Sequence, residues 1–306
     1  MRYLRILHYI ETVARVGSIR KAAEDLALTA SALNRRIQDF EAEFGTPLFE
    51  RLPRGVRLNA AGELLVRQAR VQMAEMERVR SQVADLSGIR RGHVRIACSQ
   101  AVAYTFLPEM VASYKASFPD VSFDVLVRDH LSAQQALMDY SADLALIIEP
   151  SFQSAMQPLC IVEQPLYAVI GHDHPLAGKA SLRLRELLRY PLALPERSFG
   201  GRQMLEQALA RRSLTANIVL ESNSFEFLRA FVRREPAITI QLAIGAPDDP
   251  ASHAEARGLA AIMIDPRDIP PGRLMLAQMR ERTLPVASAK FADMLTRKLE
   301  TANGRV

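Results

Sequence analysis

Residues 17–65 read GSIRKAAEDLALTASALNRRIQDFEAEFGTPLFERLPRGVRLNAAGELL, and this stretch decides the fold of the N-terminal third. Ser18 follows a glycine and is a favoured N-cap residue, so it predicts a helix over residues 19–27. Thr29 has the same role for a second helix, predicted over residues 30–44. Two short helices joined by a tight turn are typical of a helix-turn-helix.

The predicted helix over residues 30–44 is amphipathic. Its apolar stripe, spaced by three or four positions, consists of Leu33, Ile37, Phe40 and Phe44. The opposite side, at about 100° per residue, carries Ser31, Arg35 and Gln38, with Asn34 beside them. A guanidinium and a carboxamide are groups that read base edges in the major groove of DNA. An ordinary surface helix is the alternative interpretation.

A basic hairpin is predicted next, over residues 52–58, with a tip rich in proline and glycine. Arg51, Arg54 and Arg57 decorate it, and Arg54 at the tip is suited to the negative potential of a narrow minor groove. Residues 1–95 carry 17 Lys and Arg against 11 Asp and Glu, whereas the rest of the chain carries 22 against 23. This asymmetry indicates a polyanionic partner for the N-terminal third.

One long helix is predicted over residues 60–86. Positions that alternate by four and three form a coiled-coil seam, which consists of Leu65, Ala69, Gln72, Met76, Val79, Val83 and Leu86. A single amphipathic helix packed on its own domain is the alternative. Ser87-Gly88 and Arg90-Arg91-Gly92 then predict a hinge.

From His93 onward, short β-branched runs alternate with helical patterns, including a helix predicted over residues 101–117. This alternation is typical of an α/β domain with a parallel sheet, here in two lobes. Ligands bind beyond the carboxyl ends of such strands. The turns at those ends contain Ser99, Gln100, Ser198, Phe199, Gly200, Ser222 and Asn223. We expect them to bind a small organic anion, with plain helix capping as the alternative.

The N-terminal sequence resembles the DNA-binding domain of LysR-type transcriptional regulators. The resemblance lies in GS-x3-AA-x2-L, AL-x-R-x-I and G-x-PLF-x-R, all present within about sixty residues. Three departures from the family pattern are Ala30-Ser31 in place of Gln-Pro, Asn34 in place of Ser, and Asn59 in place of Thr. Because Ala30 cannot form the hydrogen bonds of a glutamine, base reading is expected to depend on Asn34, Arg35 and Gln38.

The resemblance implies an α+β multidomain protein. Its parts would be a winged helix-turn-helix at 1–60, a linker and dimerisation helix with hinge at 61–91, and an effector-binding domain at 92–306. That last domain would have a two-lobed, periplasmic-binding-protein-like (type 2) α/β fold. The first lobe would comprise 92–162 with 267–306, and the second 163–266.

The function implied is a sequence-specific regulator whose operator binding responds to a small-molecule effector. The implied partners are double-stranded DNA, the effector, a second copy or a tetramer, and RNA polymerase. The residues expected at the DNA are Ser18, Arg20, Thr29, Ala30, Ser31, Asn34, Arg35, Arg36, Gln38, Arg51, Arg54, Arg57 and Asn59.

Other classes of function find less support. The sequence contains no GxSxG, P-loop or HExxH motif, so an enzyme is not expected. His172 and His174 predict a polar turn, and neither a metal nor a cofactor is expected. A redox role for Cys98 or Cys160 stays open. A solute-binding protein without DNA function is a further alternative, but the absence of a signal sequence or long apolar run predicts a cytoplasmic protein.

Overall fold

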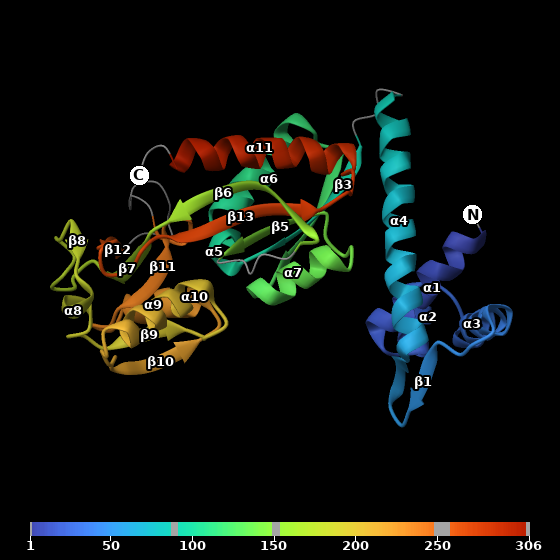
Figure 1. Ribbon diagram of the computed structural model, residues 1–306, viewed down its shortest axis with the longest axis horizontal. Helices are drawn as coiled ribbons and strands as arrows, with labels where there is room; N and C mark the ends of the chain where they lie inside the picture. The colour runs from blue at the N-terminus through green and yellow to red at the C-terminus, as the bar shows by residue number, and fades with distance from the viewer. Residues whose placement is uncertain (1, 87–90, 149–153, 248–257, 304–306) are drawn as a thin grey trace. The chain divides into compact units, whose positions relative to one another are not determined.

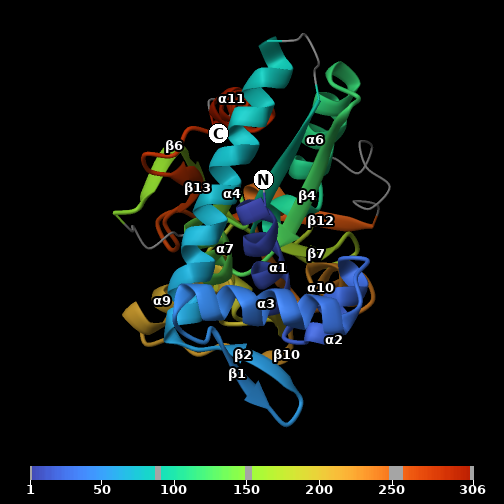
Figure 2. The same cartoon turned by 90° about the vertical axis from the view of Figure 1, so that its right-hand side faces the viewer.

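The structure is a computed structural model that describes residues 2–86, 91–148, 154–247 and 258–303. The chain divides into two compact units, Met1–Gly88 with Asp139–Ser141 and Ile89–Met138 with Ala142–Val306. Each unit has a hydrophobic core of its own. Figures 1 and 2 show both units from two directions.

The first unit is a winged helix-turn-helix followed by a long helix. Its elements are α1 (Arg2–Val16), α2 (Ile19–Asp25), α3 (Ala30–Phe44), β1 (Phe49–Leu52), β2 (Gly55–Leu58) and α4 (Ala60–Leu86). The predicted helices are confirmed, and the hairpin begins three residues earlier than expected. Side chains of α1, α2, α3 and the start of α4 form one core, which includes Leu7, Ile10, Val13, Ala22, Ala23, Leu33, Ile37, Phe40, Leu65 and Ala69.

The predicted apolar stripe of α3 is wrong in its last member. Leu33, Ile37 and Phe40 are buried, but Phe44 is 48% exposed. Phe44 stacks on Phe40 with 5.6 Å between ring centroids, at the margin of the core. Gly45, in the left-handed conformation with φ +83°, ends the helix directly after it.

The hairpin is fixed to the helix-turn-helix by a close backbone contact. The Val56 amide donates a hydrogen bond of 3.0 Å to the Gly17 carbonyl. A Cβ on Gly55 would lie 2.3 Å from that same oxygen, and Gly55 has φ +107°, so only glycine fits this position. In both views α3 and the hairpin therefore lie at the same end of the first unit (Figures 1 and 2).

The second unit is an α/β structure built on two larger sheets. Its helical elements are α5 (Gln100–Ala103), α6 (Phe106–Ser117), α7 (His130–Met138), α8 (Leu184–Leu187), α9 (Gly200–Arg211), α10 (Phe225–Val232), η1 (Ala243–Gly245) and α11 (Val286–Asn303). Its strands are β3 (Gly92–Cys98), β4 (Val121–Val127), β5 (Leu144–Ile148), β6 (Met156–Gln164), β7 (Leu166–Gly171), β8 (Ser181–Leu182), β9 (Leu192–Pro195), β10 (Ile218–Ser222), β11 (Thr239–Leu242), β12 (Leu259–Ile264) and β13 (Gly272–Met279).

Each larger sheet belongs to one lobe. The first lobe has the order β4-β3-β5-β13-β6, and the second has β11-β7-β12-β8 with the parallel pair β10-β9 nearby. The chain passes from the first sheet to the second between β6 and β7, and returns between β12 and β13. In the first lobe α6 and α11 cover one face of the sheet and α7 covers the other (Figure 1).

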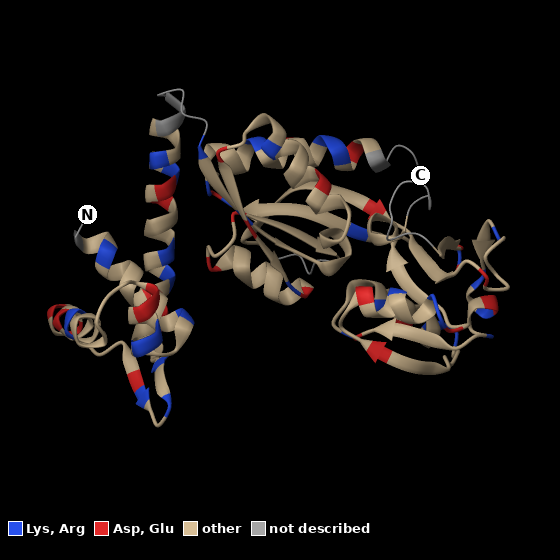
Figure 3. Cartoon of the chain, turned by 180° about the vertical axis from the view of Figure 1, so that it is seen from behind, with Lys and Arg blue, Asp and Glu red and all other residues tan. Residues whose placement is uncertain are grey.

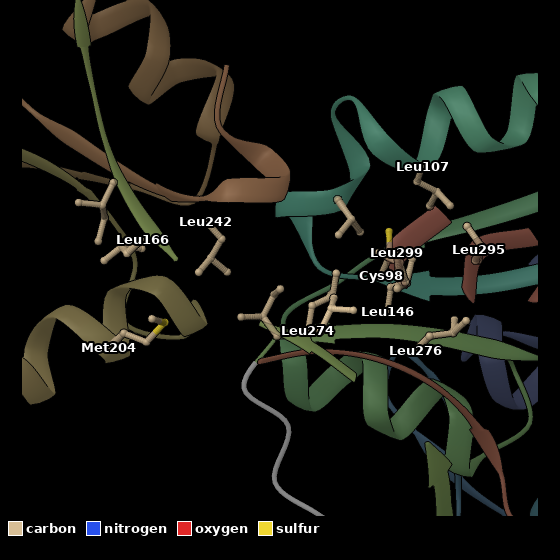
Figure 4. Packing of buried hydrophobic residues seen from close by; sticks show 14 of the residues in the cluster. Cys98, Leu107, Leu146, Leu166, Met204, Leu242, Leu274, Leu276, Leu295 and Leu299 are labelled. Carbon is tan, nitrogen blue, oxygen red and sulfur yellow. The ribbon is translucent and has the colours of Figure 1, made fainter. Parts of the chain in front are cut away.

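Leucine-rich packing fills the interior of both lobes (Figure 4). Leu146 and Leu276 lie within the first sheet, and Leu107, Leu295 and Leu299 pack on it from α6 and α11. The second lobe contributes Leu166, Met204 and Leu242 to the same cluster. This packing places the carboxyl ends of β3, β4 and β9 at the boundary between the lobes, where the site described below is found.

Two predictions for the second unit need correction. The helix expected over residues 101–117 is two helices, α5 and α6, with a break at Tyr104 and Thr105. Because Pro108 lacks an N–H, it fits only the first turn of a helix, which requires a new start just before it. Strand β6 was not expected, since Pro158 interrupts its pattern. Proline is tolerated there because β6 is an edge strand.

Ala27, in the turn between α2 and α3, has φ +52°, a region in which L-residues are strained. We expect Ala27→Gly to stabilise the chain by about 0.5–1 kcal/mol, because relief of strain exceeds the extra unfolded-state entropy of glycine. Thermal unfolding measures this effect. Ala42→Gly, in the exposed interior of α3, is the control and should destabilise by about 1 kcal/mol. A lower melting temperature for Ala27→Gly would contradict the strain.

Candidate functional site

Helix α3 presents a polar side to solvent. Ser31, Arg35 and Gln38 are exposed and Asn34 is half-buried, while the opposite side lies in the core. Thr29 caps the helix, its hydroxyl accepting a hydrogen bond of 3.2 Å from the Ala32 amide. The structure therefore brings together the side chains that the sequence predicted for base reading.

Several of the residues expected at DNA form hydrogen bonds that support the fold of the first unit. Besides Thr29, Ser18 caps α2 by accepting from the Lys21 amide. Asn59 accepts from the Gly62 amide at 2.9 Å and donates to the Pro47 carbonyl at 2.8 Å. Arg36 donates to the Tyr9 hydroxyl at 2.9 Å and lies over its ring, so it ties α3 to α1. These four side chains therefore help to hold the helices and the hairpin of the first unit in place.

The arginines of this surface fall into two groups. Arg20, Arg35 and Arg57 each form an ion pair with an acidic neighbour. The N–O distances are 3.4 Å from Arg20 to Glu24, 3.9 Å from Arg35 to Asp39 and 2.6 Å from Arg57 to Glu50. The hydrogen bond that Arg57 donates to the Glu50 carboxylate raises the pKa of Arg57. Arg51 and Arg54, on the hairpin, are exposed and form no ion pair with any described residue. Blue segments in Figure 3 mark Lys and Arg on the hairpin and along α4.

The predicted seam of α4 divides into a buried and an exposed part. Leu65 and Ala69 belong to the core of the first unit, with 8% and 1% of their surface exposed. Met76, Val79 and Val83 are exposed. Gln72 is half-buried, and the side chain of Leu86 lies outside the described residues. Leu64, which the seam omitted, is 72% exposed. Only the later positions of the seam therefore offer an apolar face to a second helix.

A cavity of about 220 Å³ lies between the two lobes of the second unit. Four residues expected from the sequence line it, namely Gln100, Ser198, Phe199 and Asn223. Sequence reasoning missed the other four, which are Val127, Arg128, Asp129 and Glu196. The rule that selected Ser99 could have found them, because they lie at or just beyond the carboxyl ends of β4 and β9.

Two of the remaining expected residues, Ser99 and Gly200, line a second, much smaller cavity. Ser99, Phe199 and Gly200 line a space of about 10 Å³, which holds no more than a single water. The Ser99 hydroxyl is 3.3 Å from the Ala101 amide, which it caps. Ser222 accepts from the Ser224 amide in the turn before α10. These hydroxyls therefore serve local turns, as the capping alternative expected.

Two hydrogen bonds join the lobes beside the larger cavity. The Phe225 amide donates to Gln100 Oε1 at 2.9 Å, which ties the start of α5 to the start of α10. His130 Nδ1 lies 3.0 Å from the Ser198 carbonyl oxygen, across the same boundary. Both hydrogen bonds thus connect the two lobes at the edge of the cavity.

The chain matches two family descriptions. Residues 4–63 match the "Bacterial regulatory helix-turn-helix protein, lysR family" and residues 87–300 match the "LysR substrate binding domain". The chain belongs to the LysR family of bacterial transcriptional regulators. Members combine a DNA-binding helix-turn-helix with an effector-binding domain, and the two units have those folds.

Individual relatives agree with this assignment. The RuBisCO operon transcriptional regulator of Allochromatium vinosum is 30% identical over 230 residues, 75% of this chain and 76% of that protein. A full-length OxyR variant from Pseudomonas aeruginosa has a TM-score of 0.71 at 20% identity, covering 95% of this chain and 94% of its own. CbnR in complex with its target DNA has a TM-score of 0.56 at 19% identity, covering 97% and 99%. These two structures show the LysR-type fold.

The cysteines of this LysR-family chain are too far apart to pair. Across the first sheet Cys98 lies opposite Leu146, Leu146 opposite Leu276, and Leu276 opposite Cys160. Three strand spacings separate the two cysteines by about 14 Å, whereas a disulfide needs Cα atoms within about 7 Å. Burial raises the pKa of Cys98 to about 12, and burial together with Glu300 raises that of Cys160. Both thiols are therefore held in the unreactive protonated form.

The described residues contain neither a metal-binding cluster nor a membrane-spanning helix. In the described ranges, no three or more His, Cys, Asp and Glu side chains are grouped to hold a metal ion. His174 is buried, with Nδ1 accepting from the Leu176 amide, and burial lowers its pKa. Within the same ranges, none of the helices combines the length and apolar character needed to cross a bilayer.

Asp39 places a carboxylate on the exposed side of α3, beside Arg35. We expect Asp39→Asn to strengthen DNA binding roughly two- to fivefold at low salt, because it removes charge repulsion with phosphates and releases Arg35. Fluorescence anisotropy with a duplex measures the change, which should shrink as salt rises. Asp293→Asn, on α11 of the other unit, makes the same change in net charge and serves as the control. Equal or weaker binding by Asp39→Asn would place this side of α3 away from DNA.

Proposed function

We propose that this LysR-family regulator reads its operator with α3 in the major groove and the β1–β2 hairpin in the adjacent minor groove. The observation that carries the proposal is the exposed polar side of α3, with Ser31, Arg35 and Gln38 opposite the side that is buried in the core. A bidentate guanidinium suits guanine, and a carboxamide suits adenine. Asn34 is placed at the edge of this surface.

The hairpin supplies the second contact. Arg51 and Arg54 are exposed and hold no acidic partner among the described residues, so their charges are available to phosphates or a narrow groove. The backbone contact between Gly17 and Val56 holds the hairpin beside the helix-turn-helix. Similarity in fold to CbnR, whose structure contains its target DNA, supports this arrangement.

The second unit is proposed to bind a small-molecule effector in the cavity that Gln100, Ser198 and Asn223 line. A dimer or tetramer would place one recognition helix on each half-site of the operator, with the exposed Met76, Val79 and Val83 as the apolar face of α4. RNA polymerase, as the target of regulation, and a cytoplasmic location belong to the same proposal. Catalysis has no part in it.

The test compares Arg35→Ala and Arg54→Ala in the full chain, on a duplex selected by the unaltered chain from a random library. Loss of Arg35 should weaken binding roughly 5- to 150-fold and relax preference at one base pair per half-site, since it removes a base contact. Loss of Arg54 should weaken binding to all sequences. It should also reduce the slope of log affinity against log salt concentration by about one, because one phosphate contact is lost. Anisotropy titrations at several salt concentrations measure both effects.

Arg185→Ala is the matched control, because Arg185 is an exposed arginine on α8 of the second unit. It should leave affinity and sequence preference unchanged. A combined Arg35→Ala and Arg54→Ala variant that keeps full affinity would show that this surface does not contact DNA.

A further inference from the structure

The cavity between the lobes carries charges of both signs. Its eight lining residues include one cation, Arg128, and two carboxylates, Asp129 and Glu196. Gln100, Ser198 and Asn223 add neutral donors and acceptors. An organic anion alone, as the sequence suggested, would meet one positive charge and an excess of negative charge in this cavity.

Asp129 contributes a permanent negative charge. Its carboxylate accepts from the Ser132 amide at 3.0 Å and from the Ser132 hydroxyl at 2.7 Å, at the start of α7. The backbone hydrogen bond is the main reason why the pKa of Asp129 is lowered. Because this carboxylate already meets the positive end of α7, that helix adds little attraction for an anionic ligand.

Arg128 and Glu196 face the cavity from different lobes and do not neutralise each other. Arg128 follows β4, and its guanidinium donates to the Val127 carbonyl at 3.1 Å. Glu196 follows β9. Throughout the described chain, neither side chain is paired with a group of opposite charge. The cavity therefore leaves one cationic and one anionic group free to meet a ligand.

The start of α9 lies beside this cavity, and its first two residues, Gly200 and Gly201, line the smaller cavity. Phe199 is its N-cap residue and supplies no side-chain hydrogen bond, so the first amides of this 12-residue helix have no capping side chain. Phe199 lines the same cavity as Arg128. The Arg128 guanidinium suits a carboxylate, whereas the Glu196 carboxylate suits an ammonium group.

We infer that the effector is a small zwitterion of the α-amino-acid class, whose carboxylate binds Arg128 and whose ammonium group binds Glu196. This inference rests on the proposed function, since it takes the cavity between the lobes as the effector site. A ligand with both charges pairs with both free groups, whereas a simple acid or a simple amine pairs with only one of them.

Calorimetric titration of the full chain tests the inference with matched sets of compounds. The common L-α-amino acids are each compared with the amine that lacks the carboxylate and the acid that lacks the amino group. At least one amino acid should bind roughly tenfold more tightly than both of its analogues, since each analogue loses a charge-assisted contact.

Two variants give opposite signatures that a general loss of structure would not produce. Glu196→Gln should weaken the amino acid and the amine roughly tenfold but spare the acid. Arg128→Gln should weaken the amino acid and the acid but spare the amine. Arg185→Gln and Glu235→Gln change exposed charges elsewhere in the second unit and should alter neither.

The outcomes separate the ligand class from the site. If an acid binds as tightly as its amino acid, and only Arg128→Gln weakens it, the class is wrong while the effector site stands. If a ligand binds but neither cavity variant changes its affinity, the site is wrong as well. If no member of any set binds, the amino-acid class is rejected. Operator binding by the same samples reports separately on the DNA-binding part of the proposal.

Discussion

Burial of one side of α3 is the constraint on which the rest of the DNA-binding unit depends. Leu33, Ile37 and Phe40 are at most 7% exposed and pack with α1, α2 and the start of α4. Burying side chains of this kind contributes about 1.5–3 kcal/mol each, whereas exposed polar residues contribute close to nothing. The rotation of the helix about its axis is therefore set by its apolar stripe. Arg35 and Gln38 face outward as a consequence.

Local signals explain why much of this unit was predictable. Caps at Ser18 and Thr29, helical periodicity, and glycine at the turns each act within a few residues, so the sequence shows them directly. Tertiary partners are not visible in this way. The pairing of Arg36 with Tyr9 joins residues 27 positions apart. In α4, periodicity cannot distinguish the side that packs on its own domain from the side that is exposed to solvent.

The second unit was harder to predict for a related reason. The position of its cavity follows from a general property of strand ends, and Gln100, Ser198 and Asn223, which that property selected, line it. Its charged side chains include Arg128 and Glu196. They line the same cavity only because two crossings of the chain bring β4 and β9 to one boundary. Edge strand β6 was missed because its pairing within the sheet overrides the local effect of Pro158. The break before α6 was missed although Pro108 is a local signal for it.

In the proposed regulator, the surface around α3 reads DNA and the boundary between the lobes of the second unit senses a ligand. The helix-turn-helix is held by apolar packing and a backbone contact to the hairpin. The boundary between the lobes is held by individual hydrogen bonds, such as those from Phe225 to Gln100 and between His130 and Ser198. A ligand with differential contacts can shift such a boundary, since its hydrogen bonds are each worth only about 1 kcal/mol.

The most direct measurement of the central claim is binding selection from a random duplex library, with the unaltered chain and with Gln38→Glu. A carboxylate accepts from the cytosine amino group, whereas a carboxamide pairs with adenine. If the polar side of α3 lies in the major groove, base preference changes at one position in each half-site and is unchanged elsewhere. Identical preferences for both proteins, or a uniform loss at every position, would contradict the account.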